Sequence, residues 1–246
     1  MTQTQAAGWS AADAPEKSVP ARFAGILFAP RATYAAVAAR PRWFGIFLTV
    51  YIITASAATA LVSTEVGRNA LLDRQKTQAE SFGRKLTQEQ IDRFETFSSY
   101  FVYATPALQF AFLAVGSLVV GGIAFAVFNA MLGGDATFKQ VFAIVSHSGV
   151  VLAVLSLFTT PLSYARESLE STTNLAVFLP FLDESSFAAR FLGSLDLIVI
   201  WWMVSLAIGL GVLYRKRTGP IAATMLAVYA AIGVIIAAVK SISTGA

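Results

Sequence analysis

The chain of 246 residues contains no cysteine and only one histidine, His147. Without thiols it forms no disulfide, offers no thiolate nucleophile and holds no metal through cysteine. A single imidazole also excludes a site built from two histidines of one chain. We therefore expect no cofactor, no metal site and no catalytic residue, because no nucleophile, base and orienting group occur together and no phosphate-binding loop is present.

Charge is scarce as well. Charged residues make up 13% of the chain, against roughly 25% in soluble domains, whereas hydrophobic residues make up 56%. The net charge of +4 is spread along the chain rather than gathered in a basic arm, so nucleic acid is not an expected partner. The composition predicts an all-α integral membrane protein whose surface is largely covered by lipid.

The clearest apolar run covers residues 197–214 and contains neither a charge nor a proline. A helix of this length rises about 1.5 Å per residue and nearly crosses a hydrocarbon layer of about 30 Å. Three cations, Arg215, Lys216 and Arg217, follow at once, and a second apolar run begins at residue 221. So short a turn joins two antiparallel neighbours, and its cations place it on the cytoplasmic side.

The same criterion divides the rest of the chain. We predict a polytopic membrane helical bundle with an N-terminal interfacial helical segment and five transmembrane helices, at residues 43–64, 104–132, 141–160, 195–214 and 221–239. Outside the membrane we predict a disordered cytoplasmic tail, an outer helical hairpin, an outer loop and a short C-terminal tail, at residues 1–20, 65–97, 161–193 and 240–246. The five-span domain then covers residues 43–239, and Pro106 falls in the first turn of the second span, where proline is tolerated.

Five spans place the N-terminus in the cytoplasm and the C-terminus outside, and we expect the bacterial inner (plasma) membrane. The orientation rests on the cations of the 215–217 turn and on Arg40 and Arg42, which precede the first span. Two helix starts are also predicted from local pattern. Thr87 with Gln90 forms a capping box, and Thr137 is placed to cap the third span.

Residues 21–42 are too short to span because Pro30 and Pro41 interrupt them. Apolar and aromatic residues alternate with arginines, which predicts two short amphipathic helices at the cytoplasmic interface. The alternative is an ordinary helix packed on the first span. The candidate lipid head-group contacts are Arg22, Arg31, Arg40, Arg42, Arg215, Lys216 and Arg217.

Polar side chains inside spans cost energy in lipid and are therefore candidates for function. They are Asp196, Gln109, Asn129, Ser146, His147 and Ser148. Asp196 and Gln109 fall about a turn from the outer face and the others near the inner face, with an almost apolar middle between the two layers. On depth alone Asp196 and His147 lie about 15–20 Å apart and do not pair.

Each of these residues has a structural interpretation beside a functional one. Asp196 is placed to cap the helix that follows it, and the alternatives are a polar contact with Gln109 or a partner, or the handling of an ion or proton. His147 is expected to hydrogen bond to Asn129 or a serine, the alternative being a ligand or titrating role. The pair 201–202, both tryptophan, is expected to supply bulk that faces lipid and packs against neighbouring helices.

Small residues at four-residue spacing favour close helix packing in a compact bundle or a homo-oligomer. They occur at Ser117 and Gly121, Gly149 and Ala153, Ala207 and Gly211, and Ala223, Ala227 and Ala231.

Three stretches of the chain resemble the Yip family of multi-pass membrane proteins, the Rab-interacting Yip/Yif domain, and in particular its small prokaryotic members. They are residues 28–34 with 40–43, residues 133–148 and residues 195–209. The resemblance covers about residues 23–239. It implies five spans with a cytoplasmic N-terminus, and its eukaryotic members are associated with Rab GTPases, membrane shaping and vesicle traffic. The N-terminal segment here has about 42 residues and no evident partner motif.

Together these features predict a non-enzymatic membrane protein that organises, tethers or assists the assembly or trafficking of membrane components. Its expected partners are membrane lipids, other membrane proteins or further copies of itself. On this hypothesis, deleting residues 21–42 removes the association and leaves the bundle folded. The alternative is a small-solute or ion transporter or channel that uses the polar residues inside the bundle.

Overall fold

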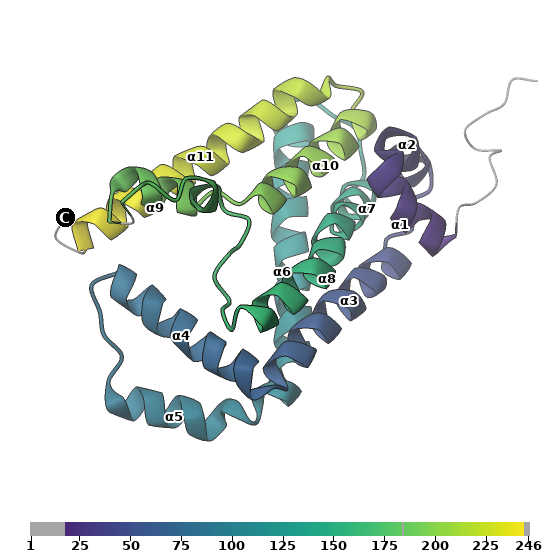
Figure 1. Ribbon diagram of the computed structural model, residues 1–246. Coiled ribbons are helices and arrows are strands. Elements are labelled where there is room, and N and C mark those ends of the chain that lie inside the picture. Colours follow the sequence, from purple (N-terminus) through teal and green to yellow (C-terminus); the bar gives the residue numbers. More distant parts are fainter. Residues whose placement is uncertain (1–17, 184, 244–246) are drawn as a thin grey trace, which may run out of the picture.

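The computed structural model describes residues 18–183 and 185–243, and its regular elements in this part of the chain are all helical (Figure 1). The helices are α1 (Val19–Phe28), α2 (Pro30–Ala39), α3 (Phe44–Val62), α4 (Glu65–Ser81), α5 (Gln88–Ser98), α6 (Phe101–Phe125), α7 (Phe138–Ser148), α8 (Val150–Ala165), α9 (Phe187–Gly193), α10 (Leu197–Leu213) and α11 (Thr218–Ser243). A π-helical segment, η1 (Ala126–Met131), continues α6, and a short 3₁₀ turn, η2 (Leu175–Phe178), precedes α9. The prediction of an all-α bundle is confirmed.

The bundle is organised around α7 and α8, which are joined at Gly149 and lie between the other helices (Figure 1). Every residue from 141 to 151 is buried. Thr137 caps α7 as predicted, and the structure adds a full capping box, since its hydroxyl accepts the Gln140 amide and the Gln140 side chain accepts the Thr137 amide. Helices α2, α3, α6 and α10 all contact this central pair.

Four stretches are long and apolar enough to cross a membrane, namely 44–62, 101–131, 138–165 and 218–243. Few side chains of the second and fourth are buried inside the protein. Exposed apolar side chains along whole helices are stable only if lipid covers them. The chain is therefore an integral membrane protein. The remaining predicted span, α10, is a shorter apolar helix, because Asp196 and Tyr214 end it after 17 residues, the lower limit for a spanning helix.

The N-terminal segment forms the two short helices that the prolines predict, but it is part of the bundle. Ser18 caps α1, so the helix begins inside the segment predicted as a tail, and Pro30 opens α2. Thr33, Tyr34 and Val37 of α2 are fully buried against α7 and α10. We therefore expect a deletion of residues 21–42 to open the core rather than to leave the bundle folded.

The remaining segments lie on the other side of the bundle, where α4 and α5 form a hairpin and α9 lies against α11 (Figure 1). The predicted capping box of Thr87 and Gln90 starts α5. Two prolines lie inside helices rather than at their ends. Helix α6 begins at Phe101, so Pro106 is not in its first turn as predicted, and α8 continues through Pro161 into the predicted outer loop.

The C-terminal end of the chain also differs from the prediction. Helix α11 runs to Ser243, so residues 240–243 are helical rather than a tail. The predicted disordered residues 1–17 and the last three residues, 244–246, lie outside the described residues.

Candidate functional site

Two segments that are far apart in the sequence meet in a cavity of about 630 Å³, here called the basic crevice. Its lining residues are Arg31, Arg215, Lys216, Arg217, Thr218, Gly219 and Pro220. Arg31 comes from α2 and the others from the α10–α11 turn and the start of α11. The Arg31 Nη2 donates a long hydrogen bond of 3.5 Å to the Thr218 hydroxyl. The structure thus brings together four of the seven predicted head-group contacts.

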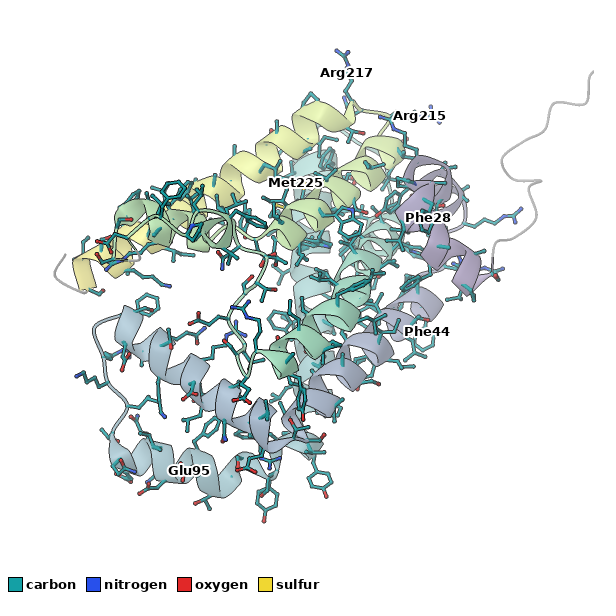
Figure 2. The ribbon with its side chains drawn as sticks, in the orientation of Figure 1. Phe28, Phe44, Glu95, Arg215, Arg217 and Met225 are labelled. Carbon is teal, nitrogen blue, oxygen red and sulfur yellow. The ribbon has the colours of Figure 1, made fainter. Side chains whose placement is uncertain are left out.

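The backbone of the turn fixes where its cations lie. Arg215 has a left-handed conformation with φ of 53° at the position after the C-cap Tyr214. The Lys216 amide bonds the Gly211 carbonyl at 2.9 Å, and the Arg215 amide bonds the Val212 carbonyl at 3.4 Å. This is the Schellman pattern of a helix end, in which glycine usually occupies the left-handed position. Figure 2 shows Arg215 and Arg217 at this end of the molecule.

Asn129, one of the predicted polar residues, anchors this turn to the neighbouring helix. Its Oδ1 accepts the Tyr214 hydroxyl at 2.6 Å, and its Nδ2 donates to the Ala136 carbonyl at 2.7 Å. The Tyr214 ring also stacks on Phe128, with centroids 4.6 Å apart. Both the oxygen and the nitrogen of the Asn129 side-chain amide are therefore hydrogen-bonded, and Asn129 positions the end of α10.

The other predicted arginines are not among the residues that line the basic crevice. The Arg22 side chain turns toward its own segment, where Nη1 donates to the Arg42 carbonyl at 3.0 Å. Its Nε is buried with no hydrogen-bond partner within the described residues. Arg40 and Arg42 are exposed near the end of α2.

The predicted inner polar residues Ser146, His147 and Ser148 are all buried in α7. Each bonds a carbonyl of its own helix. His147 Nδ1 lies 2.7 Å from the Ala143 oxygen, so it carries the proton, and the expected bond to Asn129 or a serine is absent from the described contacts. Its Nε2 is buried without a partner there. Ser148 also accepts the Trp202 indole at 3.0 Å.

Helix α2 is held to α10 by a buried pair that the sequence did not point out. The Tyr34 and Ser205 hydroxyls lie 2.8 Å apart, and Tyr34 is fully buried. Burial raises the pKa of Tyr34 far above its usual value, an effect that outweighs the opposing bond from Ser205. The phenol is therefore neutral at any physiological pH and acts as a packing and hydrogen-bonding group.

A second cavity of about 450 Å³, here called the polar cavity, lies on the other side of the bundle. Both predicted outer residues, Gln109 and Asp196, line it. Asp196 caps α10 as its position predicts, accepting the Ile198 amide at 2.8 Å. Its carboxylate also accepts the Ser171 and Thr173 hydroxyls. The carboxylate thus joins the 171–173 loop to α10, and no hydrogen bond to Gln109 is among its described contacts.

Sequence reasoning missed three residues of these sites, Tyr34, Ser205 and Thr218. Of the two tryptophans expected to face lipid and to pack between helices, Trp201 is 45% exposed, whereas Trp202 is partly buried and donates to Ser148. A tyrosine among alanines and a serine inside an apolar run carry no local signal of pairing, because the contact depends on how α2 lies against α10.

The arrangement offers charge and shape but little reactive chemistry. Within the described residues no three His, Asp or Glu side chains are placed to hold a metal ion. The basic crevice presents four cations and can attract an anion. The fold and these sites define a polytopic, all-helical membrane protein with an N-terminal helical pair built into its bundle.

The Yip1 domain family model matches residues 24–239, nearly the whole chain, and the protein belongs to this family. The resemblance seen in the sequence is confirmed. Searches of curated proteins and of solved structures found no match.

Proposed function

We propose that this Yip1 family protein is a non-enzymatic membrane protein that organises or tethers other membrane components. The observation that carries the proposal is the surface of α1 and α2, here called the α1–α2 face. It consists of the exposed residues Phe28, Arg31, Ala32, Ala35, Ala39 and Arg40.

The composition of this face suits contact with another membrane component. Phe28 is 86% exposed although the buried side of the same helical pair is tightly packed (Figure 2). Ala32, Ala35 and Ala39 follow at helical spacing and leave a flat surface that a partner helix can approach closely. Arg31 and Arg40 flank this surface and favour an anionic neighbour. Because the opposite side of α2 is buried in the core, the face is held rigidly.

The test is purification of the full chain from native membranes in gentle detergent, read by native mass spectrometry. A stoichiometric partner protein that is lost in Phe28→Ser supports the proposal. The matched control is Phe181→Ser, which removes an equally exposed phenylalanine, 79% exposed, from the 161–193 loop. A partner retained by both variants, or no partner beyond further copies of the chain and lipid, contradicts a tethering role through this face.

A second candidate function is transport of a small solute or ion, which the polar cavity favours. It brings Gln109 and Asp196 together with several hydroxyl groups, as a polar mouth would. The buried run from residue 141 to 151 fills the middle of the bundle in this conformation. Substrate-dependent flux in liposomes that is lost in Asp196→Asn or His147→Ala would favour transport, and unchanged flux would remove both residues from the mechanism.

A further inference from the structure

The basic crevice is a concentration of positive charge, and Asp135, whose charge acts on the adjoining Tyr214, is an acidic group close to it. Its cations come from two segments, Arg31 on one side and residues 215–217 on the other, and none of its lining residues is acidic. Within the described residues, Lys76 pairs with Asp73 and Arg93 pairs with Glu89. Both of these ion pairs lie in the α4–α5 hairpin. The four crevice cations repel one another, and a bound anion would relieve this repulsion.

The local backbone indicates that a cation is kept in this turn at a conformational cost. Glycine adopts the left-handed region freely, whereas a residue with a Cβ is strained there. At φ 53°, Arg215 takes the position that glycine usually holds in a Schellman motif. Residues held in sparsely populated backbone regions cluster at ligand sites.

The ends of two apolar helices form the rest of the site. The crevice lies where α10 ends and α11 begins, and Thr218 and Gly219 at the start of α11 line it. The first amides of a helix have no intrahelical acceptor and favour an anion. Beyond the crevice, α11 presents exposed apolar side chains such as Val228 and Ile232 along its length. A single lipid molecule can therefore place its phosphate group in the crevice and its hydrocarbon chains along α11.

We propose that the basic crevice binds the head group of an anionic phospholipid that carries two phosphate groups. Basic pockets next to membrane helices recognise such polyanionic head groups, and guanidinium groups bind phosphate oxygens in a bidentate manner. Arg31 and the 215–217 cations contact the phosphates from opposite sides, so the bound lipid links α2 to the α10–α11 turn. The inference names a ligand at the edge of the α1–α2 face, and in this respect it rests on the proposed function.

The experiment uses the full purified chain in nanodiscs of phosphatidylcholine doped with cardiolipin, which carries two phosphates. A parallel set contains phosphatidylglycerol, which carries one phosphate, at the same total lipid charge. Lipid that stays bound is then counted by native mass spectrometry. We expect preferential retention of cardiolipin and a loss of about fivefold in its apparent affinity for each of Arg31→Gln, Arg215→Gln and Arg217→Gln, since one surface cation contributes about that factor.

The matched control is Arg93→Gln, which removes an exposed cation from α5 and should leave cardiolipin retention unchanged. Equal retention of the two lipids, or an equal loss in Arg93→Gln, overturns the proposal because it reports charge alone. Free pyrophosphate is the competing source of paired phosphates. Displacement of cardiolipin by pyrophosphate at comparable concentration assigns the crevice to a soluble anion and overturns the lipid assignment. The measurement needs no partner protein, so its failure is distinct from failure of the tethering proposal.

Discussion

Two helical pairs flank the bundle, α1–α2 at one end and α4–α5 at the other, and one helix of each, α2 and α5, is stabilised in an opposite way. Helix α2 is only ten residues long, yet three of its residues are fully buried. Helix α5 is of similar length and has no buried residue. Figure 1 shows α1 and α2 against α7 and α10, whereas α4 and α5 extend from the end of α3.

The difference shows that a short helix in this protein is maintained either by tertiary packing or by its own local bonds. Isolated helices of about this length are marginal in water. In α5 the stabilising contacts are local, namely the Thr87 capping box and the Arg93–Glu89 pair at 2.6 Å. In α2 they are distant, such as Tyr34 with Ser205, 171 residues away in the sequence. Disrupting α2 should therefore affect the whole bundle, whereas disrupting α5 should remain local.

The largest expected effect follows Tyr34→Ala. Removing a fully buried aromatic ring leaves a cavity between α2, α7 and α10 and takes the hydrogen-bond partner from Ser205. We expect a loss of about 3–5 kcal/mol in the free energy of unfolding, measured in mixed detergent micelles. The control Phe94→Ala in the α4–α5 hairpin removes a ring that is only partly buried and should cost clearly less. Equal losses would remove the distinction between the two pairs.

A smaller effect is expected for Gly209→Ala, at the place where α10 approaches α7 and α2. A Cβ at this position would meet Cγ2 of Ile144 and the ring of Tyr34. Because neither side chain has free space, we expect a loss of about 1–3 kcal/mol, measured as above.

Gly116→Ala is the matched control, since a Cβ on Gly116 in α6 meets nothing within 4 Å. Its unfolding free energy should equal that of the parent protein or exceed it by up to about 1 kcal/mol, because alanine favours a helix over glycine. A Gly209→Ala variant of parental stability would show that the contact of α10 with α2 and α7 is looser than described.

Thr87→Ala tests the other helical pair. It removes the side-chain acceptor for the Gln90 amide and should destabilise the first turn of α5 by about 1 kcal/mol. Hydrogen exchange should quicken at the amides of residues 88–91 and remain unchanged in α7. Faster exchange throughout the bundle would mean that the hairpin is coupled to the core.

The smallest effect concerns pH, in the exposed turn before α9. The backbone amide and the hydroxyl of Ser185 both donate to Asp183 and lower the pKa of its carboxyl below the usual value. The bonds favour the ionised form, so their contribution is present above the ordinary aspartate pKa and is lost as pH falls through the lowered pKa. Carboxyl carbon NMR of aspartate-labelled protein should show this shift for Asp183 and lose the signal in Asp183→Asn. A titration midpoint of the Asp183 carboxyl at the ordinary aspartate pKa would refute this prediction.

The sequence predicted most of the fold because apolar runs here end in charges or capping residues. Thr87, Thr137 and Asp196 each cap the helix that their position indicates. Helix positions could be read from these local signals. The buried side of α2 could not be predicted in this way, because Tyr34 stands among alanines and an arginine and its burial depends on α10.

The candidate sites show the same division. The cations of the basic crevice were identified from the sequence, but the choice of Arg31 rather than Arg22 as the partner of the 215–217 turn follows from how α2 lies on α10. Asp196 and Gln109 were placed at one depth by counting residues and do line one cavity. The prediction of a hydrogen bond from His147 to Asn129 or a serine was wrong, because a histidine within a helix can bond the carbonyl four residues earlier.

Helices α1 and α2 belong to the folded bundle, which holds the α1–α2 face rigidly. Hydrogen exchange of the full chain in nanodiscs, followed by mass spectrometry, is the sharpest check of this packing. Amides of α2 should exchange as slowly as those of α7, whereas amides of α5 should exchange many times faster. If the amides of α2 exchanged as fast as those of α5, the N-terminal pair would be a detachable arm and not part of the bundle.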